Sequence, residues 1–131
     1  MKHFIFTVLA IVFICSSVLY AQEQAGIAVD VIKVCTAVED RQPLGEDTVF
    51  SSDVGKLYCY TRLTNPSGES TISHVWFYQN QQMAKIDLPV KAKTWRTWSS
   101  KNILPLWAGD WRVEVQDSSG SVLADISFII E

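Results

Sequence analysis

Several segments of this chain alternate apolar and polar residues with a period of two, and this pattern constrains the fold more than any other feature. In residues 111–116, apolar side chains occupy every second position and polar side chains lie between them; residues 56–64 show the same alternation. Successive side chains of a strand point to opposite faces, so each such segment predicts a β-strand. The expected strands are residues 28–38, 56–64, 71–78, 83–90, 94–100, 111–116 and 122–130.

Turn-forming residues separate these segments at intervals of about 8 to 12 residues, and no segment has a convincing helical period. Residues 65–68 and 118–121 are such turns, and residues 39–47 are expected to form a polar loop. A length of 131 residues with 48% hydrophobic content suits one domain with one core. These features predict an all-β fold, an antiparallel immunoglobulin-like β-sandwich of seven to eight strands, with a small barrel as the alternative.

The composition of individual strands predicts their positions in a sheet and the facing of their side chains. Residues 71–78 are apolar on both faces and predict a central strand, whereas Pro89 predicts an edge strand because proline lacks an N–H. In residues 28–38, simple alternation places Val29, Val31 and Cys35 on one face. Lys33 falls on that face too, so either its charged head reaches an edge or a β-bulge shifts the register.

Residues 1–21 have the organisation of a secretory signal peptide. Lys2 supplies the positive charge, residues 4–15 form an apolar run, and small residues precede a cleavage site after Ala21. Residues 22–26 are then a short linker and residues 27–131 the domain. We expect a periplasmic or secreted protein; the alternative is an uncleaved signal anchor in the inner membrane, the only arrangement in which the chain would contact a membrane.

Two cysteines remain after the predicted cleavage. Cys35 and Cys59 form an even pair in an oxidising compartment, which predicts a disulfide between them; two buried thiols are the alternative. Neither cysteine has a second ligand at metal-binding spacing and His74 stands alone, so no metal site is expected. No cofactor motif is present either.

The charge distribution favours local rather than general anion recognition. The net charge of −3 argues against a nucleic-acid binder, which usually carries a basic surface. The segment from Lys85 to Gly109 is nevertheless basic, because it contains five Lys or Arg residues and only one acidic residue, Asp87. This segment also contains Trp95, Trp98 and Trp107.

The tryptophan spacing in residues 94–101 points to a surface. Trp95 and Trp98 lie three positions apart in an expected strand, so both cannot point inward without a bulge. An exposed tryptophan beside arginine or lysine suits a sugar ring or a protein partner; the alternative is a ring packed under an aliphatic stem. By contrast, Trp111 is expected in the core. The candidate binding residues are Trp95, Arg96, Trp98, Ser99, Lys101, His74 and Trp76.

Catalysis is not expected. The sequence contains no recognisable nucleophile, metalloenzyme or phosphate-binding motif. His74 is interpreted as a hydrogen-bonded structural residue, since a catalytic role would need a nucleophile and an acid nearby, for which Ser99 and Asp40 are only unlocated candidates.

Five short motifs together resemble a bacterial family catalogued as domain of unknown function 2914. They are the segments at residues 35–41, 53–61, 74–76, 95–101 and 109–111. The resemblance covers nearly all of the chain after the leader. It implies an exported or membrane-tethered domain, and it implies no reaction, because none is established for the family.

Three functions remain from these observations. The first is an exported, non-catalytic binding module of the bacterial envelope that recognises a glycan, an anionic polymer or a protein through the aromatic and basic strand. The second is a structural or accessory subunit of an envelope assembly, which would bury that strand permanently. The third, least favoured, is a hydrolase that uses His74.

Overall fold

A computed structural model describes residues 26–131, so the predicted signal peptide and residues 22–25 of the predicted linker lie outside the described residues. Residues 26–131 form ten strands, seven long and three of only two or three residues. They are β1 (Ala28–Cys35), β2 (Ala37–Glu39), β3 (Gln42–Leu44), β4 (Val49–Phe50), β5 (Lys56–Thr64), β6 (Ser70–Tyr78), β7 (Gln81–Val90), β8 (Thr94–Asn102), β9 (Gly109–Gln116) and β10 (Val122–Ile130). In this part of the chain no helix is long and apolar enough to span a membrane.

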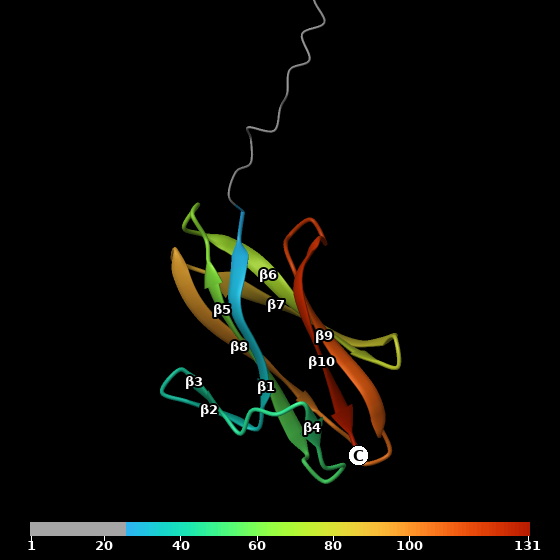
Figure 1. The fold of residues 1–131 in the computed structure, drawn as a ribbon. Coiled ribbons are helices and arrows are strands. Elements are labelled where there is room, and N and C mark those ends of the chain that lie inside the picture. The colour runs from blue at the N-terminus through green and yellow to red at the C-terminus, as the bar shows by residue number, and fades with distance from the viewer. Residues whose placement is uncertain (1–25) are drawn as a thin grey trace, which may run out of the picture.

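The strands form two open sheets that pack face to face. The small sheet has the order β1-β5-β8 and the large sheet the order β4-β10-β9-β6-β7, while β2 and β3 form a separate hairpin (Figure 1). Neighbouring strands are antiparallel except for β4, which runs parallel to β10 through two residue pairs. The prediction of a β-sandwich is confirmed, and the small-barrel alternative is wrong because the two sheets remain separate.

The core lies between the sheets and follows from the alternation in the sequence. Leu57 and Cys59 of β5 contribute from the small sheet, and Trp76, Trp111 and Phe128 contribute from the large sheet. A second cluster, around Leu63, Ile72, Val90 and Val115, fills the other end. Burying each such side chain stabilises the fold by about 1.5 to 3 kcal/mol. The expectation that Trp111 is a core residue is confirmed.

The positions of β6 and β7 agree with the sequence. β6 pairs with β9 on one side and β7 on the other, so it is central, and β7 is an edge strand. Pro89 therefore sits where a missing N–H costs no interior ladder bond.

A bulge between Val29 and Val31 corrects the expected facing of β1. Val29 lies opposite the buried Leu63, but after the bulge it is Ile32 and Val34 that face the core. Simple alternation placed Val31 with Val29, and this is wrong because the extra residue shifts the pattern by one. The alternative of a bulge is confirmed, and it turns Lys33 outward, where its Nζ lies 2.9 Å from Glu46 Oε2.

The bulge also separates the two cysteines. Cys59 lies opposite Val34 and Cys35 lies opposite Tyr58, and residues directly opposite each other share a face. Cys59 therefore points into the core and Cys35 points to the other side of the sheet. Both thiols are free and buried. The predicted disulfide is absent from this structure, which instead has the alternative arrangement of two buried thiols.

The segment expected to be a polar loop, residues 39–47, contains β3 and the turn of the hairpin that β2 and β3 form, while most of β2 lies in the expected first strand. Its turn residues Asp40 and Arg41 have left-handed backbone angles, with φ of 50° and 59°, as in the turns that suit short hairpins. The hairpin lies beside the outer face of the small sheet, where Tyr60 Oη donates a hydrogen bond to the Arg41 carbonyl at 2.8 Å.

Candidate functional site

The pairing of β8 with β5 divides the candidate residues between the two faces of the small sheet. Trp95 lies opposite the buried Leu63 and packs against the core, whereas Trp98 lies opposite Tyr60 on the outer face. Trp98 is 37% exposed. The prediction that Trp95 and Trp98 cannot both point inward is therefore confirmed.

Two arginines face each other on the outer face. Arg62 of β5 and Arg96 of β8 are direct partners in the register, and both side chains are exposed. Among residues 26–131, no carboxylate lies within ion-pair distance of either guanidinium. Like charges directly opposite each other destabilise a sheet, so this pair is unfavourable on its own.

Trp98 lies next to this pair on a rigid support. Its ring stacks on Tyr60 with a centroid separation of 6.3 Å and an interplanar angle of 16°. Tyr60 is only 3% exposed, and the hairpin carbonyl of Arg41 holds its hydroxyl. One face of the Trp98 ring is therefore fixed by Tyr60. We name Arg62, Arg96, Trp98 and Tyr60 the basic aromatic face.

Ser99, His74 and Trp76 belong to a different place, a polar network between the two sheets. His74 is fully buried; its Nδ1 lies 2.7 Å from Ser99 Oγ and its Nε2 lies 3.2 Å from Thr61 Oγ1. Trp76 Nε1 donates to Ser99 Oγ at 3.1 Å, and Thr61 Oγ1 donates to the Thr97 carbonyl at 3.0 Å. We name these five residues the buried network.

One proton arrangement satisfies every member of the buried network. The Thr61 hydroxyl uses its proton toward Thr97, so it must accept from His74 Nε2–H. His74 Nδ1 is then an acceptor, and Ser99 donates to it while accepting from Trp76. This arrangement requires a neutral imidazole. Burial lowers the pKa of His74 from 6.5 to about 4, which agrees with the neutral form.

The contact between Ser99 and His74 has the composition of a nucleophile and base, but its setting is structural. Ser99 is 5% exposed and His74 is 0% exposed. Both imidazole nitrogens are engaged by hydroxyl groups, and no carboxylate among the described residues forms a hydrogen bond with the ring. A substrate would have to enter the core to reach this pair.

Lys101 lies at the far end of β8. It is paired with Leu57, and its Nζ lies 5.0 Å from the centre of the Trp107 ring, a cation–π contact. Trp107 in turn contacts Trp111, with ring centroids 6.0 Å apart. Lys101 and Trp107 thus form part of the sandwich end rather than of the basic aromatic face.

Of the seven predicted binding residues, only Arg96 and Trp98 lie on the basic aromatic face, whereas Ser99, His74 and Trp76 lie together in the buried network. Sequence reasoning missed Arg62 and Tyr60. The alternation in residues 56–64 already placed these two side chains on one side of their strand, but only the pairing of β5 with β8 shows that they join Trp98.

The outer face of the large sheet carries a second feature that the sequence did not reveal, an open cleft of about 580 Å³. Phe77, Arg112 and Ser127 form its base; Val49 lies on one side and Asn80 on the other. Arg112 Nε and Nη2 lie 3.1 and 3.0 Å from Glu114 Oε2.

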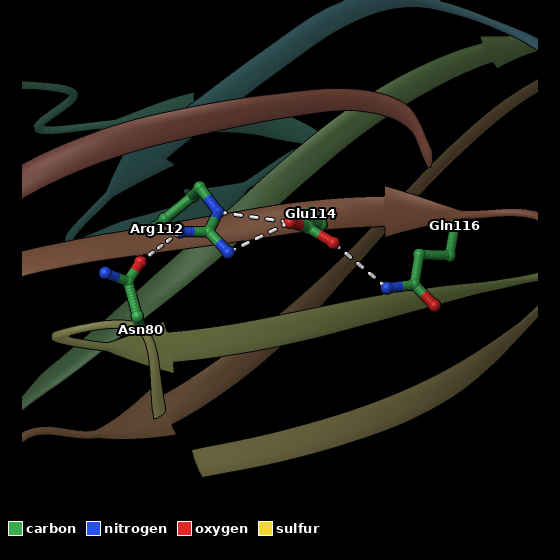
Figure 2. A network of polar contacts seen from close by, with 4 residues as sticks. All are labelled: Asn80, Arg112, Glu114 and Gln116. Carbon is green, nitrogen blue, oxygen red and sulfur yellow. Dashed lines mark hydrogen bonds and ion pairs between the residues drawn. The ribbon is translucent and has the colours of Figure 1, made fainter. Parts of the chain in front are cut away.

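Further contacts of this network fix Arg112 and Glu114 in the sheet. Arg112 Nη1 donates to Asn80 Oδ1 at 3.0 Å, and Gln116 Nε2 donates to Glu114 Oε1 at 3.1 Å (Figure 2). The guanidinium carbon also lies 4.4 Å from the centre of the Phe77 ring. Arg112 is thus held on several sides, unlike Arg62 and Arg96.

In residues 26–131, no three His, Cys, Asp or Glu side chains gather closely enough to hold a metal ion.

The second half of the chain matches the model of a known protein family. Residues 69–130 match the family described as "Protein of unknown function (DUF2914)". The match spans β6 to β10 and confirms the resemblance there, while the motifs at residues 35–41 and 53–61 lie outside it. No curated protein matches the chain.

Solved structures share the fold at low sequence identity. The chain is similar to a β-glucosidase from Erythrobacter marinus, with a TM-score of 0.53 and 4% identity over 81% of this chain and 15% of that one. It is also similar to β-glucosidase 3B from Thermotoga neapolitana in complex with glucose, with a TM-score of 0.50 and 12% identity over 79% of this chain and 15% of that one. The chain thus spans about 15% of the length of these enzymes, and the likeness concerns the fold alone.

Proposed function

We propose that this chain is an exported, non-catalytic binding module that holds an anionic envelope glycan on the basic aromatic face. The observation that carries the proposal is the direct pairing of Arg62 with Arg96, both exposed and neither in an ion pair with a described residue. An anion placed between the two guanidinium groups would relieve their repulsion.

The chemistry of the two arginines suits such a ligand. A guanidinium binds carboxylate or phosphate through two parallel N–H bonds, which gives both energy and orientation. Most charges in the rest of the chain are negative, with a net charge of −3 overall, so attraction of a polyanion must come from a local basic surface.

Trp98 supplies the apolar part of the recognition. Its ring is partly exposed and rests on the buried Tyr60, so it offers a flat surface that loses little freedom when a sugar ring covers it. A sugar polymer with acidic groups presents both an apolar ring face and an anion at short spacing. This combination favours an anionic glycan over a polyanion without rings.

Export and lack of catalysis complete the proposal. The basic and apolar leader of residues 1–21 supports export to the periplasm or beyond. The burial of His74 and Ser99 supports a non-catalytic role, because the histidine of the hydrolase alternative has no route to a substrate.

Calorimetric titration of the purified chain with acidic and neutral oligosaccharides of equal length tests this proposal. Alginate oligomers, in which every sugar carries a carboxylate, should bind to the basic aromatic face, and dextran oligomers should show no binding that Arg62→Gln or Arg96→Gln weakens. Arg62→Gln and Arg96→Gln should each weaken binding, and about 0.5 M salt should weaken the wild type similarly. Trp98→Ala should reduce affinity by a factor of roughly 30, as expected for an aromatic hot spot.

Lys85→Gln on the edge strand β7 is the matched control, since it removes an exposed positive charge from the other sheet. Equal weakening by Lys85→Gln would mean that only net charge matters and would contradict a site. Dextran binding that equals alginate binding and is lost in Trp98→Ala would show that this face recognises neutral glycans instead. A protein that co-purifies with the chain until Trp98 is changed would support the structural-subunit alternative instead.

A further inference from the structure

We propose a second binding site, for a neutral saccharide, in the cleft on the outer face of the large sheet. This site is independent of the basic aromatic face, which belongs to the other sheet. The cleft volume of about 580 Å³ lies in the range of about 300 to 1,000 Å³ that is usual for small-molecule sites.

The walls of the cleft are built by particular backbone features. On one side, β4 joins the large sheet through Val49 and Phe50 only. On the other side, Gln79 and Asn80 form the turn between β6 and β7, with φ of 49° and 65°. Gly109 lies beneath this turn with φ of 122°, and a Cβ there would come within 2.9 Å of Gln79 Nε2. The glycine thus permits this backbone angle, and beside it the turn is bonded to β9 by the hydrogen bond from Gln79 N to the Asp110 carbonyl at 2.9 Å.

The charges of the cleft argue against an anionic ligand. The Glu114 carboxylate neutralises Arg112, which also stacks on Phe77. The exposed carboxylate of Asp110 lies in the same cleft. An anion would meet Asp110 without a free positive charge to offset it, so an anionic ligand is unfavourable in this cleft.

Hydrogen-bonding groups remain available around the pair of Arg112 and Glu114. Three N–H groups of Arg112 are engaged, which leaves two of its five. Asn80 accepts from Arg112 through Oδ1, so its amide NH₂ is left as a donor. The Asp110 carboxylate is an acceptor, and the Ser127 hydroxyl is both donor and acceptor. Figure 2 shows how Arg112 connects Asn80 to Glu114.

A sugar matches this set of groups better than other neutral molecules. Each hydroxyl of a sugar donates and accepts, so adjacent hydroxyls can use a carboxylate and an amide together. The C–H faces of the ring suit the apolar side chains of Val49, Phe77 and Ile129 that also line the cleft. We therefore assign the site to a neutral saccharide of one or two rings.

Titration of the full chain with maltose, cellobiose and diacetylchitobiose tests the assignment, with calorimetry or ligand-observed NMR as the readout. At least one of the three should bind with millimolar affinity. Asp110→Asn should weaken that binding roughly tenfold, because a charged hydrogen-bond acceptor is lost. Asn80→Gly should weaken it as well, and glycine keeps the left-handed turn that alanine would strain.

Trp98→Ala and Arg96→Gln are the controls that separate this site from the proposed function. They should leave binding of the neutral disaccharide unchanged while they reduce binding of alginate. If Trp98→Ala loses disaccharide binding and Asp110→Asn retains it, the sugar binds on the small sheet, and the assignment is overturned. No binding of any of the three sugars at about 10 mM would also overturn it.

Discussion

The two faces of the small sheet use adjacent residues of one strand for opposite purposes. On the inner face, Ser99 helps to satisfy a buried, uncharged network around His74. On the outer face, Arg96 and Trp98 remain exposed, and Arg96 faces another arginine. The inner face satisfies its polar groups internally, whereas the outer face leaves charge and aromatic surface unsatisfied. Position in the alternation, rather than closeness in sequence, therefore separates structural from candidate binding residues.

The largest expected difference between the faces concerns the two tryptophans of β8. Trp95→Ala removes a ring packed against the second core cluster and should lower the free energy of unfolding by about 3 kcal/mol. Trp98→Ala removes one surface stacking contact and should cost about 1 kcal/mol. Urea unfolding of both variants measures the difference. Equal losses would mean that Trp98 is a core residue and that the outer face is not a surface.

The two adjacent serines give a second comparison. Ser99→Ala leaves Trp76 Nε1 and His74 Nδ1 without partners and should lower the free energy of unfolding by roughly 2 to 3 kcal/mol. Ser100→Ala, on the exposed outer face, should change it by less than about 0.5 kcal/mol. Chemical denaturation tests both. A small effect of Ser99→Ala would show that the buried network contributes little to stability.

The pH dependence of stability should report the neutral His74. Its pKa is about 4 in the folded chain and 6.5 in the unfolded chain, so the unfolded state binds more protons in between. Stability should be full above pH 6.5 and should fall on acidification, by about 2 kcal/mol between pH 6.5 and pH 5.

Denaturation curves across this pH range measure the effect, and His74→Gln provides the control. No other histidine occurs in residues 26–131, so the variant should lose most of the slope above pH 5. If the free energy of unfolding of His74→Gln still falls with pH as in the wild type, other groups cause the effect. If the free energy of unfolding of the wild type does not change over this pH range, His74 is not buried in its neutral form.

The smallest expected effect concerns the arginine pair of the outer face. Arg96→Glu replaces repulsion across from Arg62 with attraction and should raise stability by about 0.5 kcal/mol at low salt, less at high salt. Lys85→Glu is the control, because Lys85 lies opposite Val75 rather than a charged residue. Thermal melts at two salt concentrations compare them. A loss of stability in Arg96→Glu would contradict the claim that Arg62 and Arg96 repel each other without a compensating anion.

Much of the fold was predictable because one physical signal, the period of two, extends through most strands. The bounds of residues 56–64 and 122–130 agree with β5 and β10, and Pro89 marked the edge strand. One inserted residue in β1 reversed the facing of Val31 and Cys35. The disulfide prediction rested on the even number of cysteines and the expected export, and a cysteine count cannot show that Cys35 and Cys59 face opposite sides of the sheet. A local pattern reveals a bulge only where simple alternation would place a charged residue such as Lys33 on the apolar face.

The candidate site was less predictable than the fold. Sequence proximity grouped Trp95, Ser99 and Lys101 with Arg96 and Trp98, but their side chains belong to the core, the buried network and the sandwich end. His74 was interpreted correctly as a hydrogen-bonded residue, although its partners come from two other strands, β5 and β8. The cleft around Arg112 had no sequence signal, since its residues come from four separate segments.

The sequence by itself determined which segments form strands, which side of most strands is apolar, and the resemblance to a family that residues 69–130 confirm. Those properties depend on each residue and its near neighbours, because strand geometry makes side chains alternate. Only the tertiary structure decided that Arg62 faces Arg96, that Ser99 meets His74, and that Cys35 and Cys59 point apart. These contacts depend on strand order and register, which are fixed by how two whole sheets bury their apolar faces together.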